Sequence, residues 1–356
     1  MRGFVHDQPA VRVVFGAGVF DRLPEEVERL GATRVLVIAS PGRRSAADDL
    51  ARRLGPAAAG VFAEAAVHVP IEVVRAACET ARRLEADCCV TIGGGSTIGL
   101  GKAIALERAL MIVAVPTTYS GSEMTPIHGV TAAGVKTTGR DPRVLPKVVM
   151  YDPTLTVSLP RGISGPSGMN AIAHSVEALY APDANPIVSL CAAEGIRALA
   201  RALPIVVEQP ANLEARADAL YGAWLSGAAL GATSMGLHHK LCHALGGAFH
   251  LPHADVHTVI LPHATSFNGS AAPGAMRVVA DSLGASDAAQ GLYVLAVRIG
   301  APTSLKEIGM PADGLDRAAR LATEQPYANP RPIEYAGVRR LLDDAYRGIR
   351  PTVTSS

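Results

Sequence analysis

Residues 87–106 read DCCVTIGGGSTIGLGKAIAL, and this stretch decides the fold class. Its apolar start, Asp87–Ile92, is typical of a buried strand, three glycines then form a tight turn, and Ile98–Leu106 has the character of a helix. A strand that turns directly into a helix is one half of a βαβ unit, whose second strand runs parallel to the first. The stretch therefore predicts a parallel sheet flanked by helices.

The same alternation of strands and helices continues on both sides of this stretch, up to about residue 159. The other predicted strands are Val11–Phe15, Val35–Ser40, Gly60–Ala63, Met111–Pro116 and Val148–Asp152, and the other predicted helices run through Leu30 and over Ser45–Leu54 and Ile71–Leu84. Strictly alternating elements of this kind are typical of a doubly wound sheet. We therefore expect an α/β dinucleotide-binding domain over residues 1–158.

The second half of the chain changes character, because long segments rich in Ala and Leu replace the short apolar runs. The predicted helices are Met169–Tyr180, Ser189–Leu203, Leu213–Leu237, His238–Leu245, Ala275–Leu283, Ala288–Ile299, Leu315–Thr323 and Tyr335–Arg347. Turns rich in Pro and Gly separate them. We expect an all-helical domain over residues 159–356 that carries the substrate and metal site.

Composition excludes several classes of protein. The 33 Lys and Arg residues nearly balance the 32 Asp and Glu residues, so neither nucleic acid nor an acidic membrane surface is an expected partner. Five cysteines without a CxxC pair and an N-terminus without an apolar segment favour the cytoplasm. Ala219–Leu237 carries no charge over 19 residues, but its four glycines and its three Ser and Thr residues favour a buried helix over a membrane span.

Two loops are candidates for binding a phosphate-containing ligand. Gly93–Thr97 joins a strand to a helix N-terminus, where backbone N–H groups and the helix dipole attract an anion. Pro116–Glu123 (PTTYSGSE) follows the next strand, and ligands of open α/β sheets bind beyond the carboxyl ends of strands. Each loop has an ordinary alternative, a tight turn for the first and a hydroxyl-rich connection for the second.

The third signal is the density of histidines. Seven of the 11 histidines fall between His238 and His263. His239 and His243 are four residues apart on a predicted helix, as are Asn170 and His174, so each pair shares one helical face. Imidazoles from separate segments suit a divalent metal or a proton-transfer site. The alternative is a set of capping and solvated histidines.

Four motifs carry a resemblance to a known family. They are GGGSTIGLGK at 93–102, PTTYSGSEMT at 116–125, GMNAIAHSVEA at 168–178 and HHKLCHALGGAFHLPH at 238–253. Together they resemble the iron-type (group III) alcohol dehydrogenase superfamily and, within it, the branch of maleylacetate reductases. ANPRPI at 328–333 is also similar to that branch, and the resemblance covers nearly the whole chain.

The resemblance implies a Rossmann-like dinucleotide domain followed by an all-helical domain, the dehydroquinate synthase-like fold, with the active site between them. It implies NADH or NADPH as cofactor, and a homodimer. The positions that would bind the nucleotide are Ser40, Gly94, Gly95, Ser96, Thr97, Thr117 and Thr118.

The resemblance also implies a metal site with an altered ligand. In metal-dependent relatives an Asp and three His bind Fe or Zn, and the matching positions are Asn170, His174, His239 and His253. An amide oxygen is a weaker partner for a divalent cation than a carboxylate, so metal dependence is in question. His243 matches a nearby histidine that is not a ligand in those relatives. The catalytic candidates are His243, His174 and His253.

The function that the resemblance implies is NAD(P)H-dependent reduction of maleylacetate, a small dicarboxylate, to 3-oxoadipate in the breakdown of aromatic compounds. Lys240 and Arg140 are both candidates for anchoring its carboxylates, and the sequence does not choose between them. Two alternatives stay open. One is a metal-dependent alcohol or aldehyde oxidoreductase on the same scaffold, and the other is a nucleotide-binding protein without catalysis.

Overall fold

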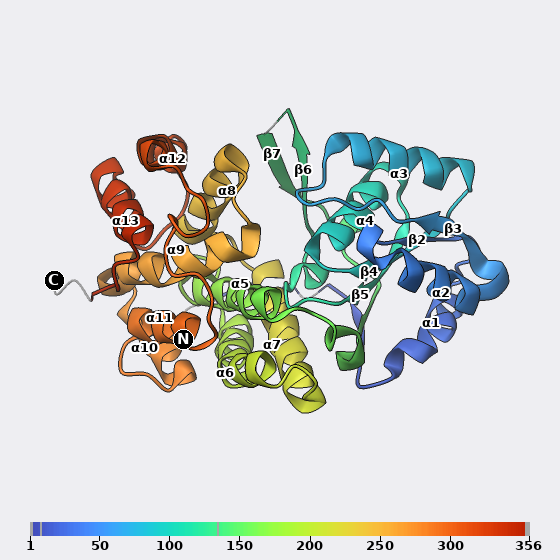
Figure 1. Ribbon diagram of the computed structural model, residues 1–356, viewed down its shortest axis with the longest axis horizontal. Coiled ribbons are helices and arrows are strands. Elements are labelled where there is room, and N and C mark those ends of the chain that lie inside the picture. Colours follow the sequence, from blue (N-terminus) through green and yellow to red (C-terminus); the bar gives the residue numbers. More distant parts are fainter. Residues whose placement is uncertain (1–2, 8, 134, 353–356) are drawn as a thin grey trace. The chain divides into compact units, whose positions relative to one another are not determined.

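The computed structural model describes residues 3–7, 9–133 and 135–352 (Figure 1). Contacts divide the chain into two compact units. One unit comprises Gln8–Leu159, and the other comprises the chain from Pro160 onward together with the N-terminal residues up to Asp7. The first is an α/β unit and the second is helical.

The α/β unit is built on six parallel strands in the order β1-β8-β5-β4-β2-β3. All six strands that the sequence predicts are present, with small shifts at their ends. Their bounds are β1 Arg12–Phe15, β2 Val35–Ile38, β3 Ala58–Phe62, β4 Cys88–Gly93, β5 Met111–Pro116 and β8 Val148–Tyr151. The parallel α/β sheet is thereby confirmed.

Helices cover both faces of this sheet, because its strands bury side chains on both sides. Along β2, Val35 and Val37 join one apolar cluster with α1 (Leu23–Arg29) and α2 (Arg44–Leu54). The alternate residues Leu36 and Ile38 join a second cluster with α3 and α4. The bounds of those helices are Ile71–Arg83 for α3 and Gly95–Arg108 for α4. Two-sided burial explains why these strands are continuously apolar.

The stretch of chain that connects β5 to β8 forms an antiparallel hairpin that was not predicted. It comprises β6 (Ile127–Ala132) and β7 (Val135–Arg140), paired from Ile127↔Arg140 to Ala132↔Val135. Most of its residues are small or polar, and most of those described are half-buried or exposed, so no apolar alternation marks it in the sequence. Arg140, one of the two candidate carboxylate anchors, is the last residue of β7.

The helical unit contains nine α-helices in the described part of the chain. They are α5 Arg161–Tyr180, α6 Pro186–Glu208, α7 Leu213–Gly231, α8 Leu237–Phe249, α9 His253–Asn268, α10 Pro273–Leu283, α11 Ala288–Arg298, α12 Leu315–Thr323 and α13 Tyr335–Arg347. The uncharged stretch 219–237 is not one helix, because α7 ends at Gly231 and α8 begins at Leu237. None of the helices in the described part combines the length and apolar character that a bilayer crossing needs.

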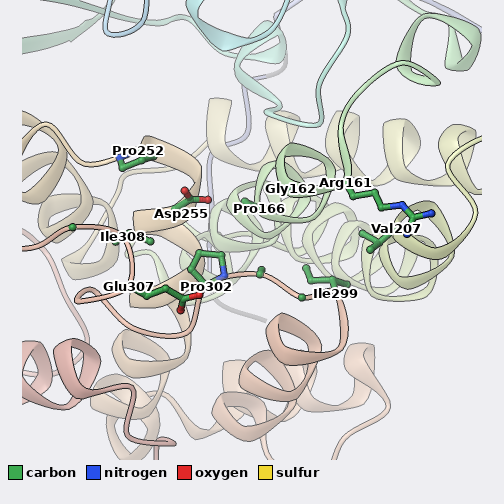
Figure 2. A pocket seen from close by; sticks show the side chains of 13 residues that line it. Arg161, Gly162, Pro166, Val207, Pro252, Asp255, Ile299, Pro302, Glu307 and Ile308 are labelled. Atoms are coloured by element: carbon green, nitrogen blue, oxygen red, sulfur yellow. The ribbon is translucent and has the colours of Figure 1, made fainter.

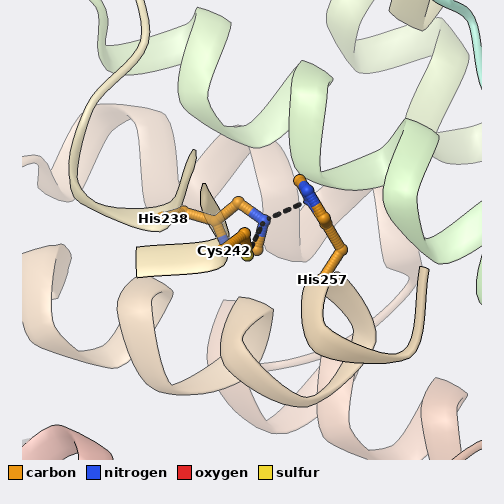
Figure 3. A group of neighbouring side chains, drawn as sticks. All are labelled: His238, Cys242 and His257. Atoms are coloured by element: carbon orange, nitrogen blue, oxygen red, sulfur yellow. Dashed lines mark hydrogen bonds between the residues drawn. The ribbon is translucent and has the colours of Figure 1, made fainter. Parts of the chain in front are cut away.

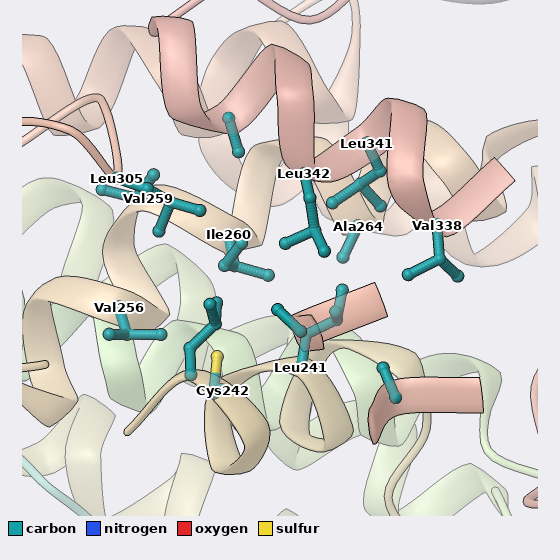
Figure 4. Close-up of a cluster of buried hydrophobic side chains, with 14 of the residues drawn as sticks. Leu241, Cys242, Val256, Val259, Ile260, Ala264, Leu305, Val338, Leu341 and Leu342 are labelled. Atoms are coloured by element: carbon teal, nitrogen blue, oxygen red, sulfur yellow. The ribbon is translucent and has the colours of Figure 1, made fainter. Parts of the chain in front are cut away.

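Three of these helices, α5, α8 and α9, are held rigidly by their surroundings. Every residue of α5 from Ser164 to Ala178 is buried, and Gly168 packs so closely that a Cβ there would lie 2.3 Å from Leu203 Cδ2. On their other sides α8 and α9 share an apolar core with α12 and α13, which includes Leu241 and Ile260 (Figure 4). Close packing of this kind fixes the side chains that the three helices carry.

Candidate functional site

The two predicted phosphate loops lie side by side in the α/β unit. They follow β4 and β5, which are neighbours in the sheet with Gly93 opposite Pro116. The Thr117 N–H donates to the Gly93 carbonyl at 2.9 Å, so the loops are joined where the strands end. The pairing of β4 with β5 thus brings the two loops together.

Close approach of the loops requires glycine. A Cβ on Gly93 would lie 2.4 Å from Thr97 Oγ1, and a Cβ on Gly94 would lie 2.8 Å from Thr118 Cγ2. Gly94 is also the N-cap residue of α4, and the helix has no side-chain cap. The buried Thr118 hydroxyl has no partner among the described residues. A helix N-terminus beside an unpartnered hydroxyl fits a nucleotide pyrophosphate.

Sheet topology supports the same location. The chain leaves β2 for β3 on one side and then returns to β4 on the other side of β2. Ligands of doubly wound sheets bind at such a change of direction, beyond the carboxyl ends of the strands. Ser40 follows β2 and is half-buried, while Ser96 and Thr97 lie in the first turn of α4. Contact of these residues with a nucleotide stays a prediction.

The predicted histidines gather in the helical unit, on α5, α8 and α9. Three hydrogen-bonding side chains form a buried chain: Glu177 Oε2 lies 2.6 Å from His239 Nδ1, and His239 Nε2 lies 2.9 Å from His174 Nδ1. An ionised carboxylate only accepts, so His239 donates from Nδ1 to Glu177. The hydrogen bond between His239 Nε2 and His174 Nδ1 extends this chain to α5.

Glu177 is the member of this buried chain that the sequence analysis did not single out. It is fully buried, and it accepts hydrogen bonds from the backbone N–H groups of Gly236 at 3.0 Å and His238 at 2.8 Å. Burial acts to raise the pKa of Glu177, but His239 and these N–H donors outweigh it, so the pKa lies below its usual value. Its spacing of three residues from His174, on the same helical face, was the available signal.

The N-terminus of α8 is therefore capped by residues from elsewhere in the unit. Gly236, its N-cap residue, offers no side chain, and the Glu177 carboxylate takes that place. The Leu237 N–H donates to Asn329 Oδ1 at 3.3 Å. Asn329 belongs to the ANPRPI segment, so that proline-rich segment helps to orient the helix that carries His239 and His243.

A second buried group lies beside the first and consists of His238, Cys242 and His257 (Figure 3). His238 Nε2 lies 2.9 Å from His257 Nδ1 and 3.6 Å from Cys242 Sγ. Burial lowers the pKa of both histidines well below the usual value, so both are neutral at pH 7. Metal binding through these atoms would leave N–H groups at His238 Nδ1 and His257 Nε2, and neither has a partner among the described residues. We therefore read the group as hydrogen-bonded.

The remaining catalytic candidates complete the cluster. The His243 ring lies 6.2 Å from the His239 ring, and the His253 ring lies 4.4 Å from the His257 ring. The His257 ring in turn lies 5.0 Å from that of His239. His243 and His253 are half-buried, whereas His239 and His257 are buried. The structure thus brings all three catalytic candidates into one cluster.

The four positions that match metal ligands in relatives form a weaker site for a divalent cation than a set with a carboxylate would. Asn170, His174, His239 and His253 are all neutral donors, so the set lacks the anionic ligand that such ions favour. The ring nitrogens of His174 and His239 are already hydrogen-bonded to each other. Asn170 Oδ1 is buried without a partner among the described residues, but one neutral oxygen does not replace a carboxylate.

A separate hollow of about 730 Å³ lies in the helical unit near the start of α5 (Figure 2). Arg161, Pro252, Asp255 and Glu307 are among the residues that line it. Burial, aided by Glu307, raises the pKa of Asp255. None of the residues predicted to bind the nucleotide or to carry the chemistry lines this hollow.

Comparison with known proteins places these features in a family. The profile of the iron-containing alcohol dehydrogenases matches residues 9–153, and that of the C-terminal part of the Fe-containing alcohol dehydrogenase family matches residues 165–346. The maleylacetate reductase of Burkholderia cepacia is 56% identical over 352 residues, covering 99% of this chain and all of the relative.

Two solved structures agree with this placement. The maleylacetate reductase of Agrobacterium tumefaciens is 52% identical, with a TM-score of 0.95 over 99% of this chain and all of that chain. The enzyme of Rhizobium sp. strain MTP-10005 is 51% identical, with a TM-score of 0.94 over the same shares. The chain belongs to the iron-containing alcohol dehydrogenase family, within its branch of maleylacetate reductases.

Proposed function

We propose that this protein reduces the C=C bond of maleylacetate to give 3-oxoadipate, with NADH or NADPH as the reductant. The observation that carries the proposal is full-length similarity to maleylacetate reductases, together with the cluster of buried His174 and His239 and half-buried His243 and His253. A substrate with two carboxylates and an enone needs a hydride source and a proton donor. The α/β unit would supply the first and the helical unit the second.

The reaction balances as a hydride and a proton added across one double bond. A bound nicotinamide would supply the hydride to the alkene carbon β to the ketone, and its electron pair displaces the π electrons onto the ketone oxygen as an enolate. A protein donor stabilises this oxygen, and a proton then reaches the α carbon. His243, His174 and His253 are our candidates.

A specific observation argues against the first alternative, a metal-dependent alcohol or aldehyde oxidoreductase. Such an enzyme uses the cation to polarise a carbonyl. The neutral donor set at Asn170 and its three histidines is poorly suited to hold that cation. A nucleotide-binding protein without catalysis would not need the imidazoles that surround His239.

The assay that tests the proposal measures oxidation of NADH and of NADPH with fresh maleylacetate, beside ethanol, simple aldehydes and no substrate. We expect turnover with maleylacetate and none with ethanol, with the aldehydes or without substrate. Turnover with an alcohol or aldehyde, and none with maleylacetate, would favour the metal-dependent alternative. Binding of the nucleotide without any turnover would favour a nucleotide-binding protein without catalysis. A homodimer stays a prediction that rests on the resemblance, and a cytoplasmic location stays a prediction that rests on the cysteine pattern and the N-terminus.

Activity is expected to survive removal of divalent metal. Because Asn170 supplies no charge, EDTA treatment should leave kcat within about twofold of the untreated protein, and metal analysis should find far less than one Zn or Fe per chain. Asn170→Asp restores a charged oxygen ligand and should raise the bound metal, with Asn185→Asp as the control. One metal ion per chain together with loss of turnover in EDTA would contradict this.

NADPH is expected to be accepted as well as NADH. In dinucleotide folds an acidic residue after the second strand binds the ribose 2′-OH and disfavours a 2′-phosphate. Here β2 is followed by Ala39–Arg44, which has no acid and ends in two arginines. Comparing kcat/KM for the two cofactors checks this, and a preference for NADH above roughly a hundredfold, about 2.7 kcal/mol, would show that another feature excludes the phosphate.

A further inference from the structure

Lys102 is a fully buried cation that neither predicted loop accounts for. It lies on α4, two turns after Gly95, and its side chain is 1% exposed. None of the ion pairs among the described residues involves it. Instead four oxygens lie within hydrogen-bond distance of its Nζ and share its three N–H donors: Ser122 O at 2.6 Å, Thr125 O at 2.7 Å, Ile127 O at 2.8 Å and Thr125 Oγ1 at 3.0 Å.

These oxygens belong to the segment that ends the second predicted loop. Ser122 follows directly after Thr117–Gly121, Thr125 lies three residues further on, and Ile127 begins the β6–β7 hairpin. Lys102 therefore ties the Ser122–Ile127 segment to α4 at three residues. The N-terminus of this helix faces the loop. A Cβ on Gly95 would lie 3.6 Å from Ser120 Oγ, which shows how near the loop comes to that N-terminus.

An ammonium group is the chemistry that this arrangement requires. Three carbonyl oxygens converge on one point, and carbonyls only accept, so without a multiple donor they would repel each other and stay unsatisfied. Burial lowers the pKa of Lys102 to about 7, and the Glu123 carboxylate opposes that shift. Glu123 is buried in the same loop and accepts from Tyr151 OH at 2.8 Å.

We propose that Lys102 is a positioning residue for nucleotide binding, because it fixes the loop of Thr117 and Thr118 against the N-terminus of α4. The proposal rests on the proposed function, in which this loop and Gly94 receive the pyrophosphate. Beyond that function, the proposal gives Lys102 a role in the affinity for the nucleotide. Loss of the ammonium frees the Ser122–Ile127 segment, so the loop spends less time in its binding geometry and the nucleotide binds more weakly.

The test uses Lys102→Met, which keeps the length of the side chain and removes its donors, and Lys102→Arg, which restores a charged donor. Lys147→Met is the matched control, since Lys147 is exposed in the same unit. We measure the Kd of NADH and NADPH by fluorescence titration, the KM and kcat with maleylacetate, and the melting temperature. Lys102→Met should raise Kd and KM about tenfold or more, with kcat at saturating nucleotide within about threefold.

Lys102→Arg should recover part of the affinity, and the control should match wild type. If Lys102→Met fails to fold, Lys102→Arg and Thr125→Val decide, because Thr125→Val removes one acceptor and keeps the ammonium. A rise in Kd of about threefold with unchanged kcat supports the proposal. Unchanged Kd in the folded variants, with only a lower melting temperature, overturns it and makes Lys102 a structural residue. Wild type that binds neither nucleotide overturns the proposed function and this inference together.

Discussion

Replacing His243 by alanine is expected to lower kcat by about 10² to 10⁴, with the Kd of the nucleotide and the melting temperature nearly unchanged. His243 is half-buried on α8, one turn beyond His239, and it is not a metal-equivalent position. We expect an imidazole there to donate to the developing enolate oxygen. Steady-state kinetics, nucleotide titration and thermal melting of His243→Ala and His243→Gln measure the effect.

His250→Asn is the matched control for this prediction. His250 is exposed at the end of the same helix, where its φ of 54° suits asparagine, so the exchange should change neither kcat nor folding. If His243 only packs against the helix, His243→Ala will lower the melting temperature and leave kcat near wild type. That outcome would transfer the proton-donor role to His174 or His253.

Glu177→Gln is expected to weaken both folding and catalysis. The carboxylate accepts from Gly236 N–H, His238 N–H and His239 Nδ1, whereas an amide offers one oxygen and adds two N–H donors. At least one buried donor then loses its partner, at a cost of about 1–3 kcal/mol in the free energy of unfolding. His239 also loses the partner that fixes its tautomer, so kcat should fall by about 10- to 100-fold.

Urea unfolding and steady-state kinetics of Glu177→Gln test the two effects separately. Glu324→Gln is the control, because Glu324 is exposed in the same unit. A loss of stability with kcat unchanged would mean that Glu177 only caps α8. Wild-type stability and kcat would contradict the hydrogen-bonded chain from Glu177 through His239 to His174.

The sequence predicted the α/β sheet well, because strands buried on both faces are continuously apolar and are bounded by glycine turns. Asp87–Ile92 corresponds to β4, shifted by one residue at each end, and Met111–Pro116 corresponds to β5. The helix α9 was missed, since Pro262 inside it reads as a helix breaker. For the same reason α5 was predicted to begin at Met169, although it continues through Pro166 back to Arg161.

The candidate site was predicted in part. Gly94 and Thr118 were found because glycine and hydroxyl residues at strand ends carry a physical signal, and His174 and His239 because imidazoles recur at helical spacing. Glu177 and Lys102 were not, because a carboxylate or an ammonium in the sequence does not reveal that it is fully buried. Only the fold specifies which backbone groups they meet.

The most direct measurement of the central claim locates the transferred hydrogen in the product. Maleylacetate is reduced with NADH deuterated at the nicotinamide C4, and the product is examined by NMR. We predict 3-oxoadipate with deuterium on the carbon β to the ketone, a position that does not exchange with water as the α carbon does. Deuterium on a carbinol carbon beside an intact C=C bond, or no product at all, would contradict the assignment of this chain as an enzyme that reduces the alkene.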